Sequence, residues 1–527
     1  MIYTSPFPAV EIPDLSVPDY LFADAASRAD HPALIDGLSG QTVTYGQLVH
    51  MVERVAAALA ERGISKGDVV GIFVPNIPYW PVVFHGVLRA GAVATTINSL
   101  HTPNEVARQL TDSGAKLLFT VSAFLDRADA AARSVGLDPA TAVIPLDGAD
   151  GRQSLKDLIA TTAPVPQVEI DPARDLAALP YSSGTTGTGK GVMLTHRNLV
   201  ANVAQSLVPL DAENIDRVLA VLPFFHIYGL NVVMNIFLRL GKTVVTLPKF
   251  DLADFLRTIQ DHRTDMVFIA PPIAVALAKH PMVDQYDLSA LKWMLSGAAP
   301  LDTDLADAVM KRLPVDLRQG YGMTETSPVT HVIPFGPLGE GVSRGTIGYP
   351  IPSTECRVVD PATGEDAQRG ELWIRGPQVM VGYLNNPEAT ASTLDADGWL
   401  HTGDVVEVTT TESGPVFTVV DRVKELIKYK GYQVPPAELE ALLLTHPQIS
   451  DAAVIGIRDA DGEEVPKAFV VRQPGADDLT EEAVMEFVAA RVAPYKKVRA
   501  VEFIDAIPKA STGKILRKEL RAREAAR

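Results

Sequence analysis

The first 125 residues alternate between two patterns of apolar positions. After Thr44, apolar side chains recur at helical spacing as far as Gly63, and Thr44 with Gln47 has the form of a capping box. The next run, at 68–76, is short, apolar and β-branched, which is typical of a strand buried on both faces. This alternation predicts a mostly parallel sheet with helices on both sides. Helix and strand patterns then follow each other at 82–91, 92–98 and 115–123.

The same alternation recurs further along the chain and then stops. A helical pattern at 252–262 precedes apolar runs at 265–271 and 291–297. From about residue 345 to 421, short strands separated by Gly and Pro predict a β-rich subdomain, beginning with the run at 346–352. Helices and strands mix again after Asp421. We therefore predict an α/β fold with a large N-terminal domain at 1–421 and a small α+β domain at 422–527.

Composition and charge narrow the class of protein. The 527 residues are 47% hydrophobic and 21% charged, which is ordinary for a globular chain, and the net charge of −17 disfavours nucleic acid as a partner. The single cysteine, Cys356, allows no internal disulfide and fits a reducing cytoplasm. We expect no export, because no Lys or Arg precedes Arg28 and no signal-type apolar core is present. Prolines and Arg89 interrupt the most apolar stretch, 69–97, so we expect no membrane span.

A loop at 181–191 is rich in glycine and hydroxyl residues. Its backbone N–H groups and hydroxyls can converge on one anion, and Lys190 adds a positive charge. The spacing from Gly184 to Lys190 matches a Walker A loop. Gly191, however, stands where that motif needs Ser or Thr for magnesium, which argues against a P-loop NTPase.

At this loop and five later segments, the chain resembles the adenylate-forming superfamily of acyl-CoA synthetases, firefly luciferase and peptide-synthetase adenylation domains. Within it the chain is most similar to 4-coumarate and cinnamate CoA ligases. The resemblance implies two steps at one site: a carboxylic acid and ATP form an acyl-adenylate, and coenzyme A then displaces AMP. The implied cofactors are ATP, Mg²⁺ and coenzyme A. The five later segments are 222–231, 296–301, 320–329, 399–404 with 419–440, and 508–520.

The resemblance also implies roles for individual residues. Lys514 matches the lysine of the adenylation step, and His226 matches the gate between the acid and thiol tunnels. Thr324 suits a phosphate oxygen, and Glu325 suits Mg²⁺ that keeps most of its waters. The implied nucleotide and coenzyme A residues are Ser182, Ser183, Gly184, Thr185, Thr186, Gly187, Lys190, Ala298, Gly320, Tyr321, Gly322, Met323, Thr324, Asp404, Val419, Arg422, Lys428, Lys430, Gly431 and Gln433.

A movement of the C-terminal domain is part of the same resemblance. In the family this domain swings about a hinge that matches Lys424, which withdraws the equivalent of Lys514 after adenylation. The stretch around Lys428, Lys430 and Gly431 then faces the thiol tunnel. We therefore expect residues 422–527 to form a mobile lid that serves both half-reactions.

The position match also predicts an acyl pocket suited to a flat, hydrophobic acid. Neither Phe225 nor His226 is acidic, whereas relatives that activate amino acids carry an aspartate there, so we expect no amino acid substrate. Leu295 stands where plant coumarate ligases carry a lysine near the ring hydroxyl. We expect both cinnamate and 4-coumarate to react. The predicted pocket residues are Ile227, Tyr228, Asn231, Phe268, Gly297, Ala298, Gly320, Gly322, Pro328 and Val329.

Three other functions use the same segments. A medium-chain fatty acyl-CoA synthetase differs only in the pocket, and a luciferase-like oxygenase differs in consuming oxygen after adenylation. A catalytically silent nucleotide-binding protein is disfavoured because Lys514, Glu325, Asp404 and Arg422 are all present. The expected partner is a small carboxylic acid, and the chain is expected to be a monomer or a homodimer.

Overall fold

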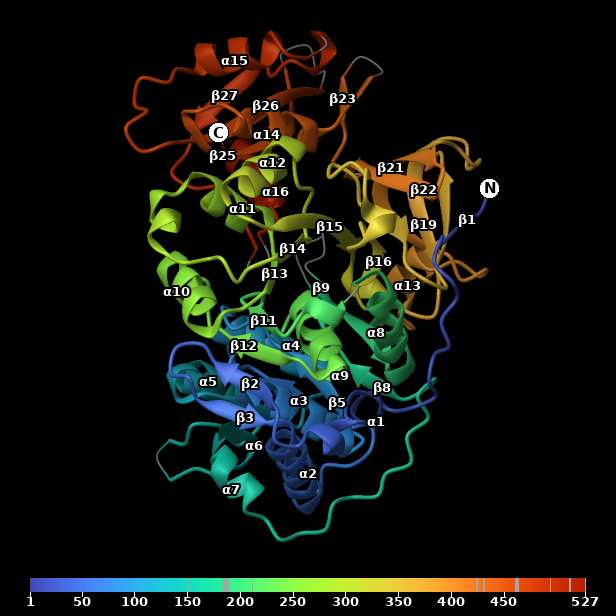
Figure 1. The fold of residues 1–527 in the computed structure, drawn as a ribbon, viewed down its shortest axis with the longest axis vertical. Coiled ribbons are helices and arrows are strands. Elements are labelled where there is room, and N and C mark those ends of the chain that lie inside the picture. The colour runs from blue at the N-terminus through green and yellow to red at the C-terminus, as the bar shows by residue number, and fades with distance from the viewer. Residues whose placement is uncertain are drawn as a thin grey trace.

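The computed structural model describes residues 1–149, 151–182, 189–210, 212–422, 425–429, 432–459, 464–492, 494–510 and 513–526. Within these residues, one sheet has eight strands, in the order β20-β10-β8-β5-β4-β6-β7 with β9 beside β10. Its strands β5, β8 and β9 are labelled in Figure 1. The five strands from β8 to β7 run parallel, and β10 joins them antiparallel. The strands are β4 (Val69–Ile72), β5 (Val93–Thr96), β6 (Leu117–Thr120), β7 (Val143–Pro145), β8 (Leu176–Ala178), β9 (Tyr181–Ser182), β10 (Lys190–Thr195) and β20 (Gly382–Tyr383).

A second sheet, with nine strands among the described residues, has the order β17-β16-β15-β14-β13-β11-β12-β2-β3. Its centre, from β15 to β2, is parallel, so the carboxyl ends of β13, β14 and β15 meet at one edge. The strands are β2 (Pro32–Asp36), β3 (Thr42–Thr44), β11 (Arg217–Ala220), β12 (Thr243–Thr246), β13 (Met266–Ile269), β14 (Trp293–Ser296), β15 (Asp316–Gly322), β16 (Val329–Val332) and β17 (Tyr349–Pro350).

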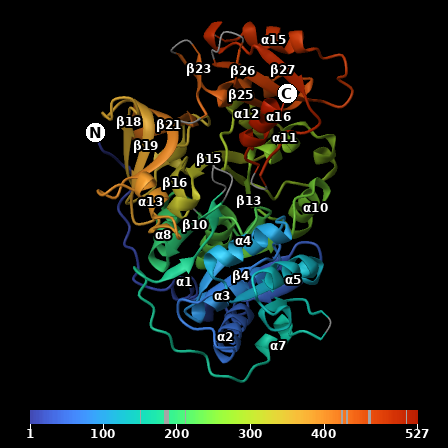
Figure 2. The ribbon, with the colours of Figure 1, turned by 180° about the vertical axis from the view of Figure 1, so that it is seen from behind.

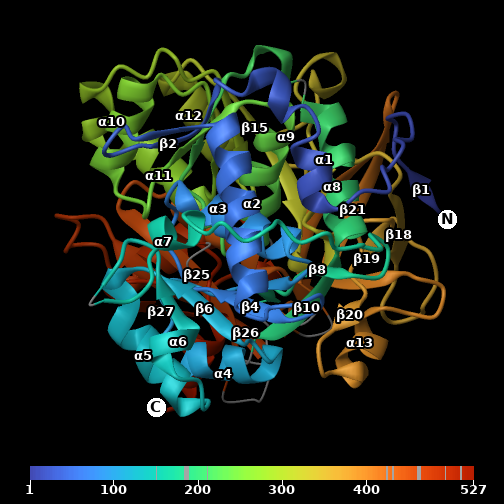
Figure 3. The same ribbon diagram turned by 90° about the horizontal axis from the view of Figure 1, so that it is seen from below.

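Helices cover both sheets, and two of them lie between the sheets. Figure 3 shows α2 and α3 between β2 and β4; α2 contacts the nine-stranded sheet and α3 the eight-stranded one. The predicted capping box of Thr44 and Gln47 is confirmed at the start of α2. The helices are α1 (Val17–Leu21), α2 (Tyr45–Glu61), α3 (Tyr79–Arg89), α4 (Pro103–Ser113), α5 (Leu125–Ser134), α6 (Pro139–Ala142), α7 (Leu155–Ile159), α8 (His196–Leu210), α9 (Ile236–Leu240), α10 (Leu252–His262), α11 (Pro271–Lys279) and α12 (Thr303–Arg312).

The β-rich region forms an antiparallel sheet in the order β1-β18-β19-β21-β22, and α13 (Pro387–Thr393) contacts β20 and β21. The run at 346–352 was expected to belong to the β-rich subdomain. Instead, β17 within this run pairs with β16 of the nine-stranded sheet, and the run's isolated bridge to β22 is at Gly348. The segment around Asp404 also lies inside a strand, because pairing with β19 and β22 satisfies its backbone. The strands are β1 (Tyr3–Thr4), β18 (Glu355–Val359), β19 (Arg369–Arg375), β21 (Leu400–Thr411) and β22 (Gly414–Arg422).

The C-terminal segment has hydrophobic clusters of its own, formed by buried residues between 427 and 520. It sits over α11 and α12 at one end of the molecule (Figures 1 and 2). Lys279 Nζ donates to the carbonyl of Leu444 at 3.2 Å across this contact. The elements are β23 (Ile427–Tyr429), β24 (Tyr432–Val434), α14 (Pro436–Leu444), β25 (Ile449–Arg458), β26 (Glu464–Arg472), α15 (Glu481–Ala489), β27 (Ala500–Phe503) and α16 (Arg517–Ala525).

Candidate active site

An apolar cavity of about 730 Å³, including its open mouth, lies at the carboxyl ends of β13, β14 and β15. Ligand sites of open parallel sheets lie at this edge, because the loops that follow the strands diverge there. All the predicted pocket residues except Asn231 lie on its wall. The side-chain amide of Asn231 instead donates to the carbonyl of Ser327 at 2.7 Å, so it fixes the segment before Pro328.

Two aromatic rings form one side of the cavity. The rings of Tyr228 and Phe268 meet edge to face, with centroids 6.0 Å apart, and the Tyr228 hydroxyl donates to the carbonyl of Leu295 at 3.3 Å. A Cβ atom at Gly297 would lie 2.9 Å from the Tyr228 ring. The absence of a side chain at Gly297 therefore accommodates the Tyr228 ring as well as a substrate ring. Gly322 has a similar role, since a Cβ there would lie 2.2 Å from the Pro328 carbonyl oxygen.

His226 lies at the start of the π-helical segment η4 (Tyr228–Asn235) and lines the cavity. Burial lowers the pKa of its imidazole to about 4, and the positive charge of Lys514 contributes to the same shift. The ring is thus neutral at pH 7. Its Nδ1 accepts a hydrogen bond from the backbone N–H of Tyr228 at 3.2 Å, which assigns the ring proton to Nε2.

Lys514 belongs to the C-terminal segment, and its charge acts on His226 of the cavity wall. It ends a turn in which the N–H of Ala510 donates to its carbonyl at 2.8 Å, and Gly513 has a φ of +83°. A Cβ on Gly513 would lie 3.2 Å from Pro272 and 3.5 Å from Ala270, so the turn packs against the start of α11. The structure therefore brings Lys514 and His226 together from segments almost 290 positions apart.

Tyr383 contacts both Glu325 and Lys190, and no sequence motif indicated this tyrosine. Glu325 lies in the short helix η6 (Thr324–Thr326), where it is 6% exposed and Thr324 is also buried. The Tyr383 hydroxyl donates to Glu325 Oε1 at 2.8 Å, and Lys190 Nζ lies 4.5 Å from the centre of the Tyr383 ring. Burial, with the neighbouring Glu325 charge, raises the pKa of Tyr383. The phenol thus stays protonated and donates to the carboxylate.

The donor set near Glu325 fits a magnesium ion that substrate phosphates help to hold. The described residues include no group of three or more His, Cys, Asp or Glu side chains that could hold a metal by themselves. Mg²⁺ usually binds one or two carboxylates and completes its shell with phosphates and water. A single buried carboxylate with a fixed orientation is consistent with that arrangement.

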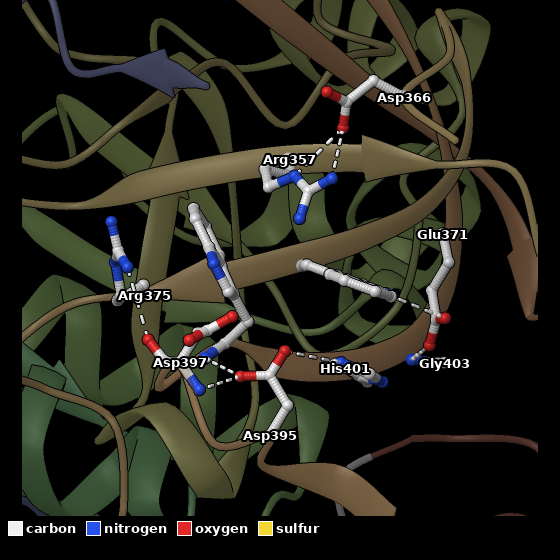
Figure 4. Close-up of polar contacts among 10 residues, drawn as sticks. Arg357, Asp366, Glu371, Arg375, Asp395, Asp397, His401 and Gly403 are labelled. Atoms are coloured by element: carbon white, nitrogen blue, oxygen red, sulfur yellow. Dashed lines mark hydrogen bonds and ion pairs between the residues drawn. The ribbon is translucent and has the colours of Figure 1, made fainter. Parts of the chain in front are cut away.

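Asp404 faces Tyr321 at the opposite side of the site. The Tyr321 hydroxyl donates to Asp404 Oδ2 at 2.6 Å, and Asp404 pairs in register with Arg422 across β21 and β22. The strand is fixed just before it by Glu371, whose Oε1 accepts from the N–H of Gly403 at 2.8 Å (Figure 4). A carboxylate held in this way can accept hydrogen bonds from a ribose. Val419 lies partly buried on β22, and Ser182 pairs with Lys190 between β9 and β10.

Several predicted site residues have no described position. The residues outside the described ranges are Ser183, Gly184, Thr185, Thr186, Gly187, Lys424, Lys430 and Gly431. For Arg422, Lys428 and Gln433 the backbone is described and the side chain is not. The wall of the cavity also includes residues that no motif indicated, from α8, the end of β16 and the segment after it: Ser206, Pro209, Leu210, Val332 and Phe335.

Comparison with known proteins places this site in a family. Residues 21–384 match the family described as AMP-binding enzyme, and residues 438–514 match the AMP-binding enzyme C-terminal domain. The 4-coumarate–CoA ligase 3 of Oryza sativa subsp. japonica is 43% identical over 540 residues, covering 100% of this chain and 95% of the relative. No helix within the described ranges is long and apolar enough to cross a membrane.

Solved structures have the same fold. An anthranilate CoA ligase in complex with anthranoyl-AMP superposes with a TM-score of 0.89 at 26% identity, covering 98% of this chain and 99% of the other. ATP-bound MatB from Rhodopseudomonas palustris superposes with a TM-score of 0.84 at 31% identity, covering 97% and 99%. The predicted mixed α/β fold, with a large N-terminal and a smaller C-terminal domain, is confirmed. The chain therefore belongs to the adenylate-forming family of AMP-binding enzymes, among the relatives of the 4-coumarate–CoA ligases.

Proposed function

We propose that the protein is an AMP-forming acid–thiol ligase that converts a hydrophobic, arylpropenoic acid to its coenzyme A thioester. The observation that carries the proposal is the position of Lys514, whose charge acts on the neutral His226 at an apolar cavity. A cation near His226, on the wall of an apolar cavity, suits a substrate with a carboxylate at one end and a hydrophobic body. The relatives named 4-coumarate–CoA ligase support the same reaction.

In the first step, a carboxylate oxygen attacks the α-phosphorus of ATP, and the bond to pyrophosphate breaks. The Lys514 ammonium neutralises charge on the carboxylate and the phosphate, because its flexible stem lets it reach both. Lys190 and Thr324 hold phosphate oxygens. Mg²⁺ on Glu325 would supply further neutralisation of the phosphates, and Tyr383 keeps the Glu325 carboxylate in place.

In the second step, the coenzyme A thiol attacks the acyl carbon and AMP leaves. The Nε2–H of His226 is a hydrogen-bond donor in the arrangement described above, so it can hold the acyl oxygen that develops negative charge. We further propose that residues 422–527 act as the lid predicted from the sequence, with the hinge at Lys424. This movement withdraws Lys514 and brings the segment around Lys428, Lys430 and Gly431 to the thiol.

The nucleotide is held by the groups on either side of the cavity mouth. Asp404 and Arg422 would hold the ribose, and Tyr321 offers a ring beside it for the purine. The remaining assignments of the sequence analysis, including Ala298, Met323, Val419 and Gln433, stay predictions. So do the cytoplasmic location and the monomer or homodimer state.

A panel of carboxylic acids tests the proposal. The purified protein is incubated with ATP, Mg²⁺ and each acid, with and without coenzyme A, and AMP release is measured. We expect AMP release with cinnamate and 4-coumarate that depends on coenzyme A. Equal AMP release in both conditions would overturn the ligase reaction. Higher kcat/KM for octanoate or decanoate than for every aryl acid would overturn the proposed substrate class.

A further inference from the structure

Strand β21 is irregular at the point where it carries Asp404. Its pairing with β19 shifts register between Glu371 and Trp373. At this point β19 has the single residue Leu372, whereas β21 has the three residues 402–404 opposite it. The strand therefore bulges at the residues that include Asp404. Bulges change the direction in which a side chain leaves a sheet, and they are frequent beside active sites.

Side chains hold the backbone of this bulge, because a bulge interrupts the hydrogen bonds between strands. The N–H of Gly403 donates to Glu371 Oε1 at 2.8 Å, and the N–H of Asp404 donates to Thr402 Oγ1 at 3.1 Å. Thr402 Oγ1 in turn donates to the carbonyl of Leu372 at 2.7 Å. Gly403 has a φ of +71°, a left-handed conformation that favours glycine. Glu371 thus fixes the bulge from the neighbouring strand.

The Glu371 carboxylate is itself held in a defined orientation. The indole N–H of Trp373 donates to Glu371 Oε2 at 3.0 Å, so each of the two carboxylate oxygens accepts one N–H. A neutral amide has one acceptor oxygen and could not accept both bonds in this way. The Trp373 ring stacks on His401 at 3.9 Å between centroids, and His401 Nε2 lies 3.4 Å from Asp395 Oδ2 (Figure 4).

Asp404 receives its position from this bulge. The residue is 7% exposed, and its Oδ2 accepts from the Tyr321 hydroxyl at 2.6 Å. The backbone N–H that Glu371 binds belongs to Gly403, the residue immediately before Asp404. A movement of the backbone at Gly403 therefore moves the Asp404 carboxylate relative to Tyr321 and to a ribose bound beside it.

We propose that Glu371 is a positioning residue for ATP, which holds the bulge of β21 so that the Asp404 carboxylate meets the ribose hydroxyls. The inference rests on the proposed ligase function and its assignment of the ribose to Asp404. Glu371 acts through the backbone of Gly403 and not by contact with the nucleotide. Without its carboxylate, the Gly403 N–H loses its acceptor and the bulge shifts. The ribose hydroxyls then lose hydrogen bonding, while the groups that hold the phosphates and the acid are unchanged.

The test compares ATP with 2′,3′-dideoxy-ATP, which lacks both ribose hydroxyls. Pyrophosphate release is measured with saturating 4-coumarate and coenzyme A, and we expect the wild-type kcat/KM to be higher for ATP. In Glu371→Ala this ratio falls about tenfold, which corresponds to about 1.4 kcal/mol, through a higher KM for ATP. In Glu371→Gln the fall is smaller, because the amide oxygen still accepts from Gly403. The ratio does not depend on the fraction of a variant that is folded.

Glu355→Ala is the matched control. Glu355 lies on the adjoining strand β18, and its carboxylate binds Arg375 of β19 at 2.7 Å. This variant should leave the ratio of the two nucleotides unchanged. A second comparison tests the route through Asp404. Asp404→Ala lowers the ratio by itself, and adding Glu371→Ala to it should lower the ratio no further.

The outcomes separate the inference from the function on which it rests. An unchanged ratio in Glu371→Ala, even when both nucleotides react more slowly, would overturn the inference and leave the ligase function intact. A further fall in the double variant would overturn the action through Asp404. Equal use of both nucleotides by the wild-type protein would overturn the ribose assignment and the inference with it. A failure of the ligase function would instead appear as absence of coenzyme A-dependent AMP release with every acid.

Discussion

Replacing Gly297 with alanine should damage use of the acid and spare use of ATP. The added Cβ would lie 2.9 Å from both the Oη and the Cε1 atom of Tyr228, well inside van der Waals contact. The ring cannot move freely, because its hydroxyl bonds the Leu295 carbonyl at 3.3 Å and its edge packs on Phe268. The ring must therefore shift by several tenths of an ångström toward the space that the substrate occupies.

The size of the effect follows from the cost of overpacking. Forcing one additional methyl group into a well-packed site typically costs about 1–3 kcal/mol. If this free energy opposes binding of the acid, kcat/KM for the acid falls by about 5- to 150-fold. Gly37→Ala is the matched control, because a Cβ there would also lie 2.9 Å from its nearest neighbours, Thr246 and Thr258, and none of these residues lines the cavity.

Steady-state kinetics with 4-coumarate and with ATP as the varied substrate separate the two effects. We expect Gly297→Ala to lower kcat/KM for 4-coumarate while the KM for ATP stays near the wild-type value. Gly37→Ala should change either parameter only slightly. An unchanged kcat/KM for the acid in Gly297→Ala, or an equal loss in the Gly37→Ala control, would refute this prediction.

Three further predictions concern charge. Lys514→Gln should lower acid-dependent exchange of pyrophosphate into ATP by at least about 100-fold while thioester formation from supplied acyl-adenylate persists; parallel loss of both would contradict the assigned role. Tyr383→Phe should raise the Mg²⁺ concentration needed for half-maximal adenylation, because the Glu325 carboxylate loses its hydrogen bond, and an unchanged Mg²⁺ dependence would argue against this positioning. Burial lowers the pKa of His85 from 6.5 to about 3. Below pH 6.5 the unfolded chain therefore binds a proton that the folded chain excludes. The free energy of unfolding then falls by about 1.4 kcal/mol for each pH unit. Relative to His85→Leu, which lacks this group, the wild-type free energy of unfolding measured in urea should fall by about 2 kcal/mol between pH 7 and pH 5; an equal pH dependence would contradict the prediction.

Local sequence patterns predicted those helices and strands that the residues of a short segment specify by themselves. The capping box at Thr44, the helix at 252–262 and the buried strand at 265–271 all appear in the structure as α2, α10 and β13. Those residues encode capping, helical periodicity or burial on both faces of a sheet, and each of these effects acts within about ten positions. The local residues around Asp404 did not indicate its place inside strand β21, because a strand is stabilised by hydrogen bonds to partners outside its own segment, here β19 and β22.

By itself, the sequence determined the class of fold, the family and the chemistry of the candidate groups, because these depend on residue types at fixed spacing. The tertiary structure decided which groups meet. Lys514 reaches His226 only because the C-terminal segment packs on α11, and Tyr383 reaches Glu325 and Lys190 only because β20 pairs with β10. The place of Ser206 on the cavity wall likewise has no signature in the sequence. Which side chains line a cavity depends on everything packed around it, and that is a property of the folded chain.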